Sequence, residues 1–313
     1  MNKGQKCSSP MAGRGTVDGI PLRVAHSART ERRLHCDVST IRKDNRVSRA
    51  FAVQLLSLAL TATTLAQPSD TAAVSSDPMF TRRDAVWAGA FVVSSILMFQ
   101  VDDDIDRWIA RENIQESDFI RRGAEIANLA KDDQVMLAGA LVYIAGRIAK
   151  KRDLADIAFH STEAVLVSSI FLTLVRGSLG RSRLYVTPDD LTHFKAFEGF
   201  KQFEYRSFPS IHASANFAVA AVISSEMKRR WPGKARWVPP VLYTAATLPT
   251  ISRLYLRRHW ISDLVLGSFV GVLTGLKIEQ YHHTHPGNKI DKVFLGVRAE
   301  NERAQIVLFE HRF

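Results

Sequence analysis

Cysteine is almost absent from this chain of 313 residues, which contains only Cys7 and Cys36. A disulfide, a thiol nucleophile and a thiolate metal site are therefore excluded from everything after residue 36. Uninterrupted apolar runs are also short, although 46% of the residues are hydrophobic. Length and composition exclude a small disulfide scaffold and a disordered polymer, and they fit one large domain or two ordinary ones.

Acidic residues are too few to balance the basic ones, and the formal net charge is +11. Such an excess raises nucleic acid or an anionic membrane as a partner. Most of it lies at one end, because residues 1–49 hold 11 Lys and Arg against four Asp and Glu, a net of +7, which leaves +4 for residues 50–313. The sequence therefore predicts no nucleic-acid partner.

The N-terminal region lacks the pattern of a folded domain. Residues 1–46 are polar and basic, which predicts a disordered leader or a mis-assigned start. Residues 47–66 combine Arg49, an apolar run and small residues, the pattern of a signal peptide or an uncleaved N-terminal anchor. A true start near Val47 would place this signal at the terminus. The predicted divisions after it are a linker (67–79), a main helical domain (80–280) and a C-terminal tail (281–313).

Six apolar segments of 15 to 19 residues follow: 85–100, 135–149, 157–175, 213–227, 237–251 and 264–278. A helix needs about 20 apolar residues to cross a bilayer, so these segments fit either membrane helices or the helices of a soluble bundle. The predicted fold class is an all-α bundle with six transmembrane helices. A short β-hairpin-like tail is predicted at Val293–Arg298 and Ala304–Phe309.

Basic clusters next to the apolar segments predict a topology. Arg82–Arg83, Lys150–Arg152 and Lys228–Arg230 all fall on the cytoplasmic side if the first segment runs outward, as the positive-inside rule expects. The acidic run Asp102–Asp104 then lies outside and is interpreted as the cap of an exposed loop. A cleaved signal peptide would place the mature N-terminus outside and invert this order, so the two predictions conflict.

Ionisable residues inside apolar segments are costly in lipid, and we expect them to face the bundle interior and pair. The residues concerned are Arg147, His160 and Glu163. Amphipathic, partly wet helices are the alternative. Three histidines follow the last apolar segment and are interpreted as solvated rather than metal-binding: His282, His283 and His285.

A first cluster of polar residues follows the third apolar segment, where Arg176, Arg181 and Arg183 alternate with glycine and serine. Guanidinium groups on a glycine-rich turn suit bidentate binding of phosphate oxygens. A basic loop at a membrane face is the alternative. In the predicted topology, however, this cluster lies on the outer side, where basic residues are not expected.

Two further clusters flank later segments. Pro209 and Ser210 mark a helix start just before His212, and a helix N-terminus attracts an anion. His259 and Asp263 are four residues apart and share a helix face, so the carboxylate can hold an imidazole poised for nucleophilic attack. A capping serine and an ordinary surface His/Asp pair are the alternatives. Successive helices alternate in direction, so the end of the third segment, the start of the fourth and the junction of the fifth and sixth lie on one side. All three clusters therefore meet there, which favours a shared phosphate site.

At these residues the chain resembles the type 2 phosphatidic acid phosphatase (PAP2) superfamily, which includes vanadium haloperoxidases. The family pattern is K-x6-R-P, then P-S-G-H, then S-R-x5-H-x3-D, and the resemblance covers roughly residues 80–280. The third motif matches in full at Ser252, Arg253, His259 and Asp263. The second matches at Pro209, Ser210 and His212, with Ile211 in place of glycine. In the first, Arg183 matches, Arg176 replaces lysine and Leu184 replaces proline.

The resemblance implies a PAP2-type helical bundle that hydrolyses a phosphate ester through a phosphohistidine, with no metal and no other cofactor. His259 would attack phosphorus, Asp263 would orient it, and His212 would protonate the leaving group. The implied phosphate ligands are Arg176, Arg183, Ser210, Ile211 and Arg253. Arg176 keeps the positive charge of the family lysine but changes its geometry, and Ile211 adds bulk beside the phosphate.

The expected function is hydrolysis of a lipid phosphate at the periplasmic face of a bacterial inner membrane. The expected substrates are phosphatidic acid, phosphatidylglycerol phosphate or an isoprenyl diphosphate such as undecaprenyl diphosphate. One alternative is a soluble periplasmic acid phosphatase of the same superfamily. A second is a catalytically inactive membrane protein that binds a phosphorylated lipid. The sequence predicts no oligomeric state.

Overall fold

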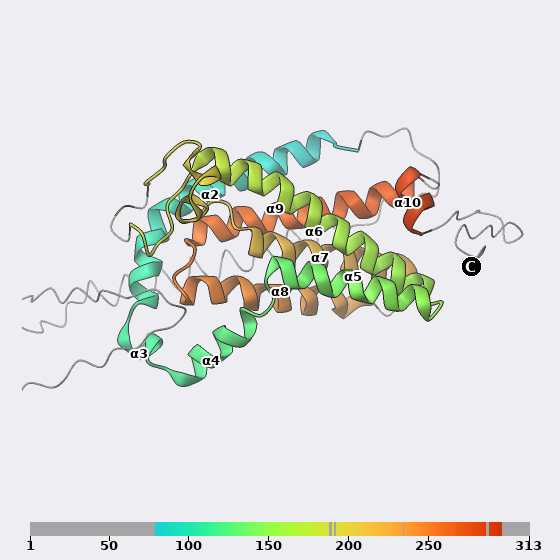
Figure 1. Ribbon diagram of the computed structural model, residues 1–313, viewed down its shortest axis with the longest axis horizontal. Helices are drawn as coiled ribbons and strands as arrows, with labels where there is room; N and C mark the ends of the chain where they lie inside the picture. The colour runs from blue at the N-terminus through green and yellow to red at the C-terminus, as the bar shows by residue number, and fades with distance from the viewer. Residues whose placement is uncertain (1–78, 188–189, 191, 234, 286–287, 296–313) are drawn as a thin grey trace, which may run out of the picture. The chain divides into compact units, whose positions relative to one another are not determined.

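The computed structural model describes residues 79–187, 190, 192–233, 235–285 and 288–295. They lie within one compact unit, Asp44–Phe313. The predicted leader, the signal or anchor and nearly all of the linker fall outside the described residues. The α-helices are α2 (Arg82–Ile109), α3 (Glu112–Gln115), α4 (Asp118–Ala127), α5 (Asp132–Ile148), α6 (Arg152–Leu179), α7 (Ile211–Arg230), α8 (Val238–Tyr255), α9 (Ile261–Thr284) and α10 (Lys289–Phe294) (Figure 1).

The all-α prediction is confirmed for this part of the chain, where β pairing is limited to one isolated bridge between Arg181 and Phe194. Each of the six apolar segments lies within a long helix, α2, α5, α6, α7, α8 or α9. The short helices α3 and α4 were not predicted. Ser117 begins α4 by accepting a hydrogen bond from the backbone N–H of Ile120, which is the usual action of an N-cap serine.

Close packing of α9 on α7 forms the centre of the bundle. Gly267, Gly271 and Gly275 repeat every four residues along one face of α9. A methyl group added at any of them would come within 2.6 Å or less of a backbone oxygen of α7, at Ser210, Ser214 and Ala218 respectively. Larger residues on this face would therefore push the helices apart, and the glycines fix how the N-termini of α7 and α9 meet.

The helix directions bring the three polar clusters together. The end of α6, the start of α7, the end of α8 and the start of α9 lie at the same end of the helix bundle (Figure 1). This agrees with the prediction from alternating helix directions that the three clusters lie on one side. The sidedness of that end with respect to a membrane stays a prediction.

Three of the described helices, α2, α6 and α9, are long and apolar enough to cross a membrane. The prediction of six spans is therefore not confirmed, and α5 has only 17 residues. Large apolar side chains nevertheless lie exposed along α2, α5 and α6, among them Val93, Leu97, Leu137, Leu141, Ile170 and Phe171. A continuous apolar surface of this kind marks contact with lipid or protein, which agrees with a membrane-embedded protein.

Two sequence interpretations need correction. Asp102–Asp104 lies inside α2 and not in an exposed loop, and Asp102 is 1% exposed because it pairs with a buried arginine. The predicted tail hairpin falls mostly outside the described residues, and its first two positions, Val293 and Phe294, end α10 instead of starting a strand.

Candidate active site

Asp263 lies at the centre of the site, in the first turn of α9, and is completely buried. One carboxylate oxygen, Oδ2, accepts hydrogen bonds from Ser207 Oγ at 2.5 Å and the Trp260 backbone N–H at 3.0 Å, and it lies 3.3 Å from His259 Nδ1. The other oxygen accepts from Arg181 Nη1 at 2.6 Å. A carboxylate accepts only, so it holds the proton of His259 on Nδ1 and leaves the Nε2 lone pair available.

A buried ion network fixes Asp263 from behind. Arg181 is fully buried and bridges two carboxylates, Asp263 on α9 and Asp102 on α2, with Nη2 2.8 Å from Asp102 Oδ2. Ser262 completes the network, because its backbone N–H and hydroxyl both donate to Asp102. The sequence indicated Arg181 only as one of three arginines, and it placed Asp102 in the cap of an exposed loop. The signal that could have indicated this role is the position of Asp102 just after an apolar segment. A charged aspartate there costs free energy unless it is paired.

Four aromatic rings surround the guanidinium of Arg181 and exclude water from it. The Arg181 Cζ atom lies 4.5 Å from the ring centroid of Phe99, 5.3 Å from Trp260, 5.7 Å from Phe194 and 5.8 Å from Phe208. Cation–π contacts of this kind gain strength when the cation is desolvated. The network is therefore a rigid base for Asp263 and not a phosphate-binding group.

The start of α7 brings the second histidine to the site. Ser210 is the N-cap of α7, and its backbone N–H donates to the Asp263 carbonyl oxygen at 3.0 Å, which ties α7 to α9. His212 follows, with its ring centroid 6.4 Å from that of His259. Its Nε2 lies 3.3 Å from Asp132 Oδ1. The two imidazoles are therefore neighbours at the positively polarised N-terminus of α7.

Three arginines lie close enough to His212 for their charges to lower its pKa: Arg253, Arg183 and Arg176. Arg183 is 2% exposed and lies over the Phe203 ring at 4.1 Å, and Arg253 is 8% exposed and donates to Asn128. Arg176 lies on the last turns of α6. The Nε atoms of Arg176 and Arg253 are buried without a hydrogen-bond partner among the described residues. Buried donors normally find a partner, so both atoms are free to hold an anion.

The structure thus brings together every site residue predicted from the sequence. Ile211, in place of the family glycine, is the first residue of α7 and is 2% exposed. Leu184, in place of the family proline, is equally buried. Ile211 keeps a backbone N–H at the helix N-terminus, which is the group that an anion would use there.

Burial and positive charge keep both imidazoles neutral. Burial lowers the pKa of His259 to about 4, although the hydrogen bond to Asp263 opposes the shift. Burial, together with the charge of Arg253, also lowers the pKa of His212. Burial lowers the pKa of the Arg183 guanidinium, which nevertheless stays charged at neutral pH. A neutral nucleophile beside fixed cations suits attack on a phosphate group.

The His/Asp pair, the second histidine and the arginine cluster at one end of the bundle are groups that suit the binding of an anion such as phosphate. Residues 158–286 match the family model of the PAP2 superfamily. This is the superfamily that the three motifs resemble, and the matched region contains all three of them.

Two individual proteins are similar to this chain. A lipid A 1-phosphatase from Porphyromonas gingivalis is 39% identical over 69 residues, which are 22% of this chain and 15% of the relative. The matched part therefore spans about a seventh of that relative's length. The crystal structure of a transmembrane PAP2-type phosphatidylglycerolphosphate phosphatase from Bacillus subtilis aligns with a TM-score of 0.44 at 15% identity, over 64% of this chain and 98% of the other.

Proposed function

We propose that the protein is a membrane-bound phosphatase that hydrolyses a phosphate ester or diphosphate on a lipid. The observation that supports it best is the buried His259–Asp263 pair next to His212, with the charges of Arg176, Arg183 and Arg253 close to His212. The match of residues 158–286 to the PAP2 superfamily model supports phosphatase chemistry. Exposed apolar surface on α2, α5 and α6 supports a lipid environment over the soluble acid phosphatase.

In the proposed reaction, His259 Nε2 attacks phosphorus and forms a P–N bond while the P–O bond to the lipid breaks. The protonated imidazole of His212 gives its proton to the leaving alkoxide. Water then attacks the phosphohistidine, His212 takes the proton of that water, and inorganic phosphate leaves with His259 restored. Arg183, Arg253 and Arg176 stabilise the charge on the equatorial oxygens as the transition state forms.

The lowered pKa values give a specific pH dependence. His212 is neutral in the free protein, so the proton that it transfers must arrive with a phosphate monoanion, whose second pKa is about 6. We expect kcat/KM to fall above roughly pH 6, and to fall below pH 4 because His259 then becomes protonated and loses its lone pair. A pH–rate profile on a soluble aryl phosphate, with circular dichroism at each pH as the control, measures both limbs. A decrease of kcat/KM on the acid side with its midpoint near the ordinary pKa of histidine would contradict the proposal for His259.

Phosphate release by the purified protein tests the substrate class. The panel contains phosphatidic acid, phosphatidylglycerol phosphate, undecaprenyl diphosphate and lipid A 1-phosphate in mixed micelles, with a soluble aryl phosphate as the reference. The last two lipids extend the panel to a diphosphate and to the class that the P. gingivalis relative is named for. We expect at least one lipid to exceed the aryl phosphate in kcat/KM by about tenfold or more, because burial of the lipid's apolar part adds binding energy. A preference for the aryl phosphate over every lipid would favour the soluble acid phosphatase, and no hydrolysis at all would favour the inactive lipid-binding protein.

We further propose that the site faces the periplasm from a bacterial inner membrane. The basic clusters at Arg82–Arg83, Lys150–Arg152 and Lys228–Arg230 lie at the opposite helix ends from the site, and basic clusters favour the cytoplasm. The phosphate-release assay also tests this orientation when intact spheroplasts are given an aryl phosphate that cannot cross the membrane. Hydrolysis that requires lysis of the spheroplasts would contradict it.

A further inference from the structure

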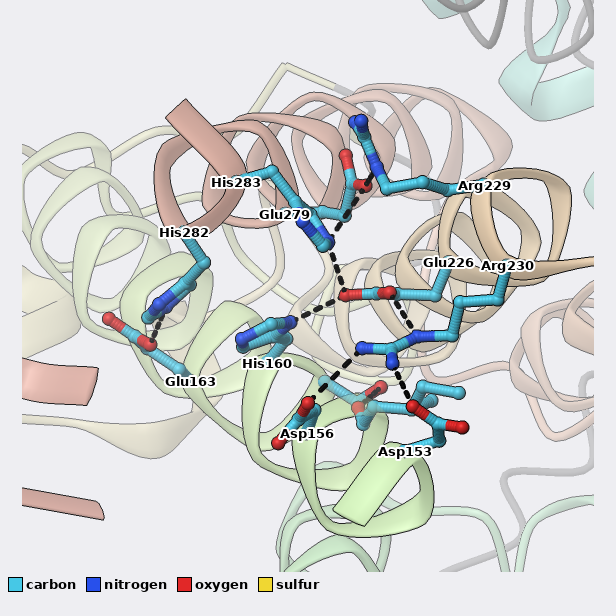
Figure 2. A network of polar contacts seen from close by, with 12 residues as sticks. Asp153, Asp156, His160, Glu163, Glu226, Arg229, Arg230, Glu279, His282 and His283 are labelled. Carbon is cyan, nitrogen blue, oxygen red and sulfur yellow. Dashed lines mark hydrogen bonds and ion pairs between the residues drawn. The ribbon is translucent and has the colours of Figure 1, made fainter. Parts of the chain in front are cut away.

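Histidines and carboxylates also gather at the end of the bundle away from the active site, where they pair with one another. His160 Nδ1 lies 2.7 Å from Glu226 Oε1, and His282 contacts Asp291 on one side and Glu163 on the other. Figure 2 shows His160 beside Glu226 and His282 beside Glu163. The expectation that His160 and Glu163 pair inside the bundle is confirmed, although not with each other. The prediction of a solvated His282 is wrong, because this side chain is 5% exposed.

A fourth arginine, Arg258, lies at the edge of the candidate active site. It immediately precedes His259, and its backbone N–H donates to the Arg253 carbonyl oxygen at 2.9 Å. The family pattern leaves this position free, since it is the last of the five unspecified residues between Arg253 and His259. An arginine here is therefore a feature of this chain and not of the superfamily motif.

The turn after α8 sends two neighbouring arginines to different partners. Arg257 has a φ of 51°, in the left-handed region, and its guanidinium pairs with both carboxylate oxygens of Asp106 on α2. Arg258 is exposed, and its Cζ atom lies 5.7 Å from the centroid of the Tyr185 ring. Within the described part of the chain, no carboxylate pairs with Arg258. Its charge is therefore available to an anion from outside the protein.

Tyr185 places Arg258 relative to the buried arginines. Tyr185 follows Arg183 in a turn that is closed by a hydrogen bond from the Val186 N–H to the Arg183 carbonyl oxygen at 2.9 Å. The Tyr185 side chain is 47% exposed, whereas Arg183 is buried. Burial lowers the pKa of the Arg183 guanidinium, and the positive charge of Arg258 adds to this effect. An exposed positive charge thus lies next to the buried ones.

We propose, on the basis of the proposed phosphatase function, that Arg258 binds a second phosphate group joined to the one that His259 attacks. The preferred substrate is then the diphosphate ester of a lipid alcohol. The two phosphorus atoms of a diphosphate share one oxygen, so the second phosphate lies directly beside the first. Arginine suits this position, because its guanidinium binds phosphate oxygens in a bidentate manner. A single phosphate held by Arg183 and Arg253 would leave Arg258 without an anion.

A diphosphate also fits the neutral state of His212. His259 Nε2 attacks the terminal phosphorus and forms the P–N bond, while the bond from that phosphorus to the bridging oxygen breaks and the oxygen keeps the electron pair. The leaving group is a lipid monophosphate, whose second pKa is about 6, so it needs no proton at neutral pH, unlike an alkoxide. Arg258 stabilises the charge that this phosphate gains. Water then cleaves the P–N bond, His212 takes the proton of that water, and inorganic phosphate leaves.

Farnesyl phosphate and farnesyl diphosphate in mixed micelles test the specificity, because they differ only in the second phosphate. We expect the unmodified protein to prefer the diphosphate by about tenfold or more in kcat/KM. Arg258→Gln should lower kcat/KM by about 10–100-fold for the diphosphate and by less than about threefold for the monophosphate. Arg258→Lys, which keeps the charge without the bidentate geometry, should retain part of the preference.

Arg236→Gln is the matched control. Arg236 is also exposed and lies 5.6 Å from the centroid of an aromatic ring, that of Trp237, but it stands just before α8, at the opposite end of the bundle. The preference for the diphosphate should be unchanged in this variant. Equal losses for the two farnesyl substrates in Arg258→Gln would overturn the proposal, because a charge that only attracts anions in general lowers both rates alike.

Binding of two phosphonates separates the second-phosphate site from the phosphatase function. Methylenediphosphonate has a P–C–P bridge that cannot be hydrolysed, and methylphosphonate is the reference with one phosphorus. By calorimetry on the full-length protein in detergent, we expect the unmodified protein and Arg236→Gln to bind the diphosphonate about tenfold more tightly, and Arg258→Gln to bind both alike. This result without hydrolysis of any substrate would refute the phosphatase function and support the site. No preference of the unmodified protein for the diphosphonate would overturn the site, whatever the hydrolysis rates.

Discussion

Replacing His259 by alanine is expected to lower kcat/KM for phosphate release by about 10⁴-fold or more, with the protein still folded. Loss of an enzymic nucleophile costs this much because the chemistry of the first step disappears while substrate binding remains. His259 is 1% exposed, and its Nδ1 faces the buried Asp263, so no other imidazole can take its place. His212 lies nearby on α7, but the carboxylate closest to it, Asp132 at 3.3 Å from Nε2, is 33% exposed and not buried like Asp263.

The matched control for His259→Ala is His285→Ala, which removes an exposed histidine of the same chain. Chemical trapping adds a second measurement, because the unmodified protein quenched in alkali after a short reaction with a ³²P-labelled substrate should retain acid-labile label on a histidine. His259→Ala should retain none. Unchanged hydrolysis in His259→Ala would falsify the proposed mechanism, and label elsewhere in the chain would reassign the nucleophile.

Replacing Arg181 by methionine is expected to lower the free energy of unfolding by about 3–5 kcal/mol and to reduce activity strongly. The change leaves Asp102 and Asp263 buried together without their shared cation, and an uncompensated buried charge costs about that much. One of the two carboxylates must then take up a proton. Activity falls because Asp263 no longer has a fixed charge and position with which to orient His259. Thermal or denaturant unfolding in detergent, together with phosphate release, measures both effects.

Arg257→Met is the matched control, because Arg257 also forms a bidentate pair, with Asp106 at the same end of the bundle, but its side chain is 39% exposed. An exposed pair contributes about 0–1 kcal/mol. The double variant Arg181→Met/Asp102→Asn removes one of the two stranded carboxylates and should recover part of the lost stability. Equal losses in Arg181→Met and Arg257→Met would contradict the role given to the buried network.

Local patterns in the sequence predicted the helices and the candidate site residues. Apolar segments predicted six helices, because each must bury or embed a continuous apolar surface whatever it packs against. The motif around His259 and Asp263 predicted their pairing, but the expected shared helix face is wrong, because His259 precedes α9 and reaches Asp263 from the loop before its N-cap. The convergence of Arg176, Ser210 and His259 followed from counting alternate helix directions, which is also local information.

Contacts between distant residues could not be read in this way. Asp102 and Arg181 are 79 residues apart, and neither residue type nor spacing links them. The acidic run was assigned to an exposed loop because three adjacent aspartates are usually solvated. In the structure, successive residues of α2 point in different directions, so Asp102 faces the bundle while Asp103 and Asp104 are only partly buried. His282 was misjudged for the same reason, because only the folded chain places it against His160 and Glu163.

The sequence by itself predicted the helical class, the resemblance to the PAP2 superfamily and the residues that carry the proposed chemistry, because all three depend on composition and short spacings. Tertiary structure alone decided which charges are buried. It placed Arg181 between two aspartates, left the Nε atoms of Arg176 and Arg253 free for an anion, and brought two histidines and an aspartate together at the far end of the bundle. Burial and partner choice arise from packing between helices, and packing is a property of the whole fold.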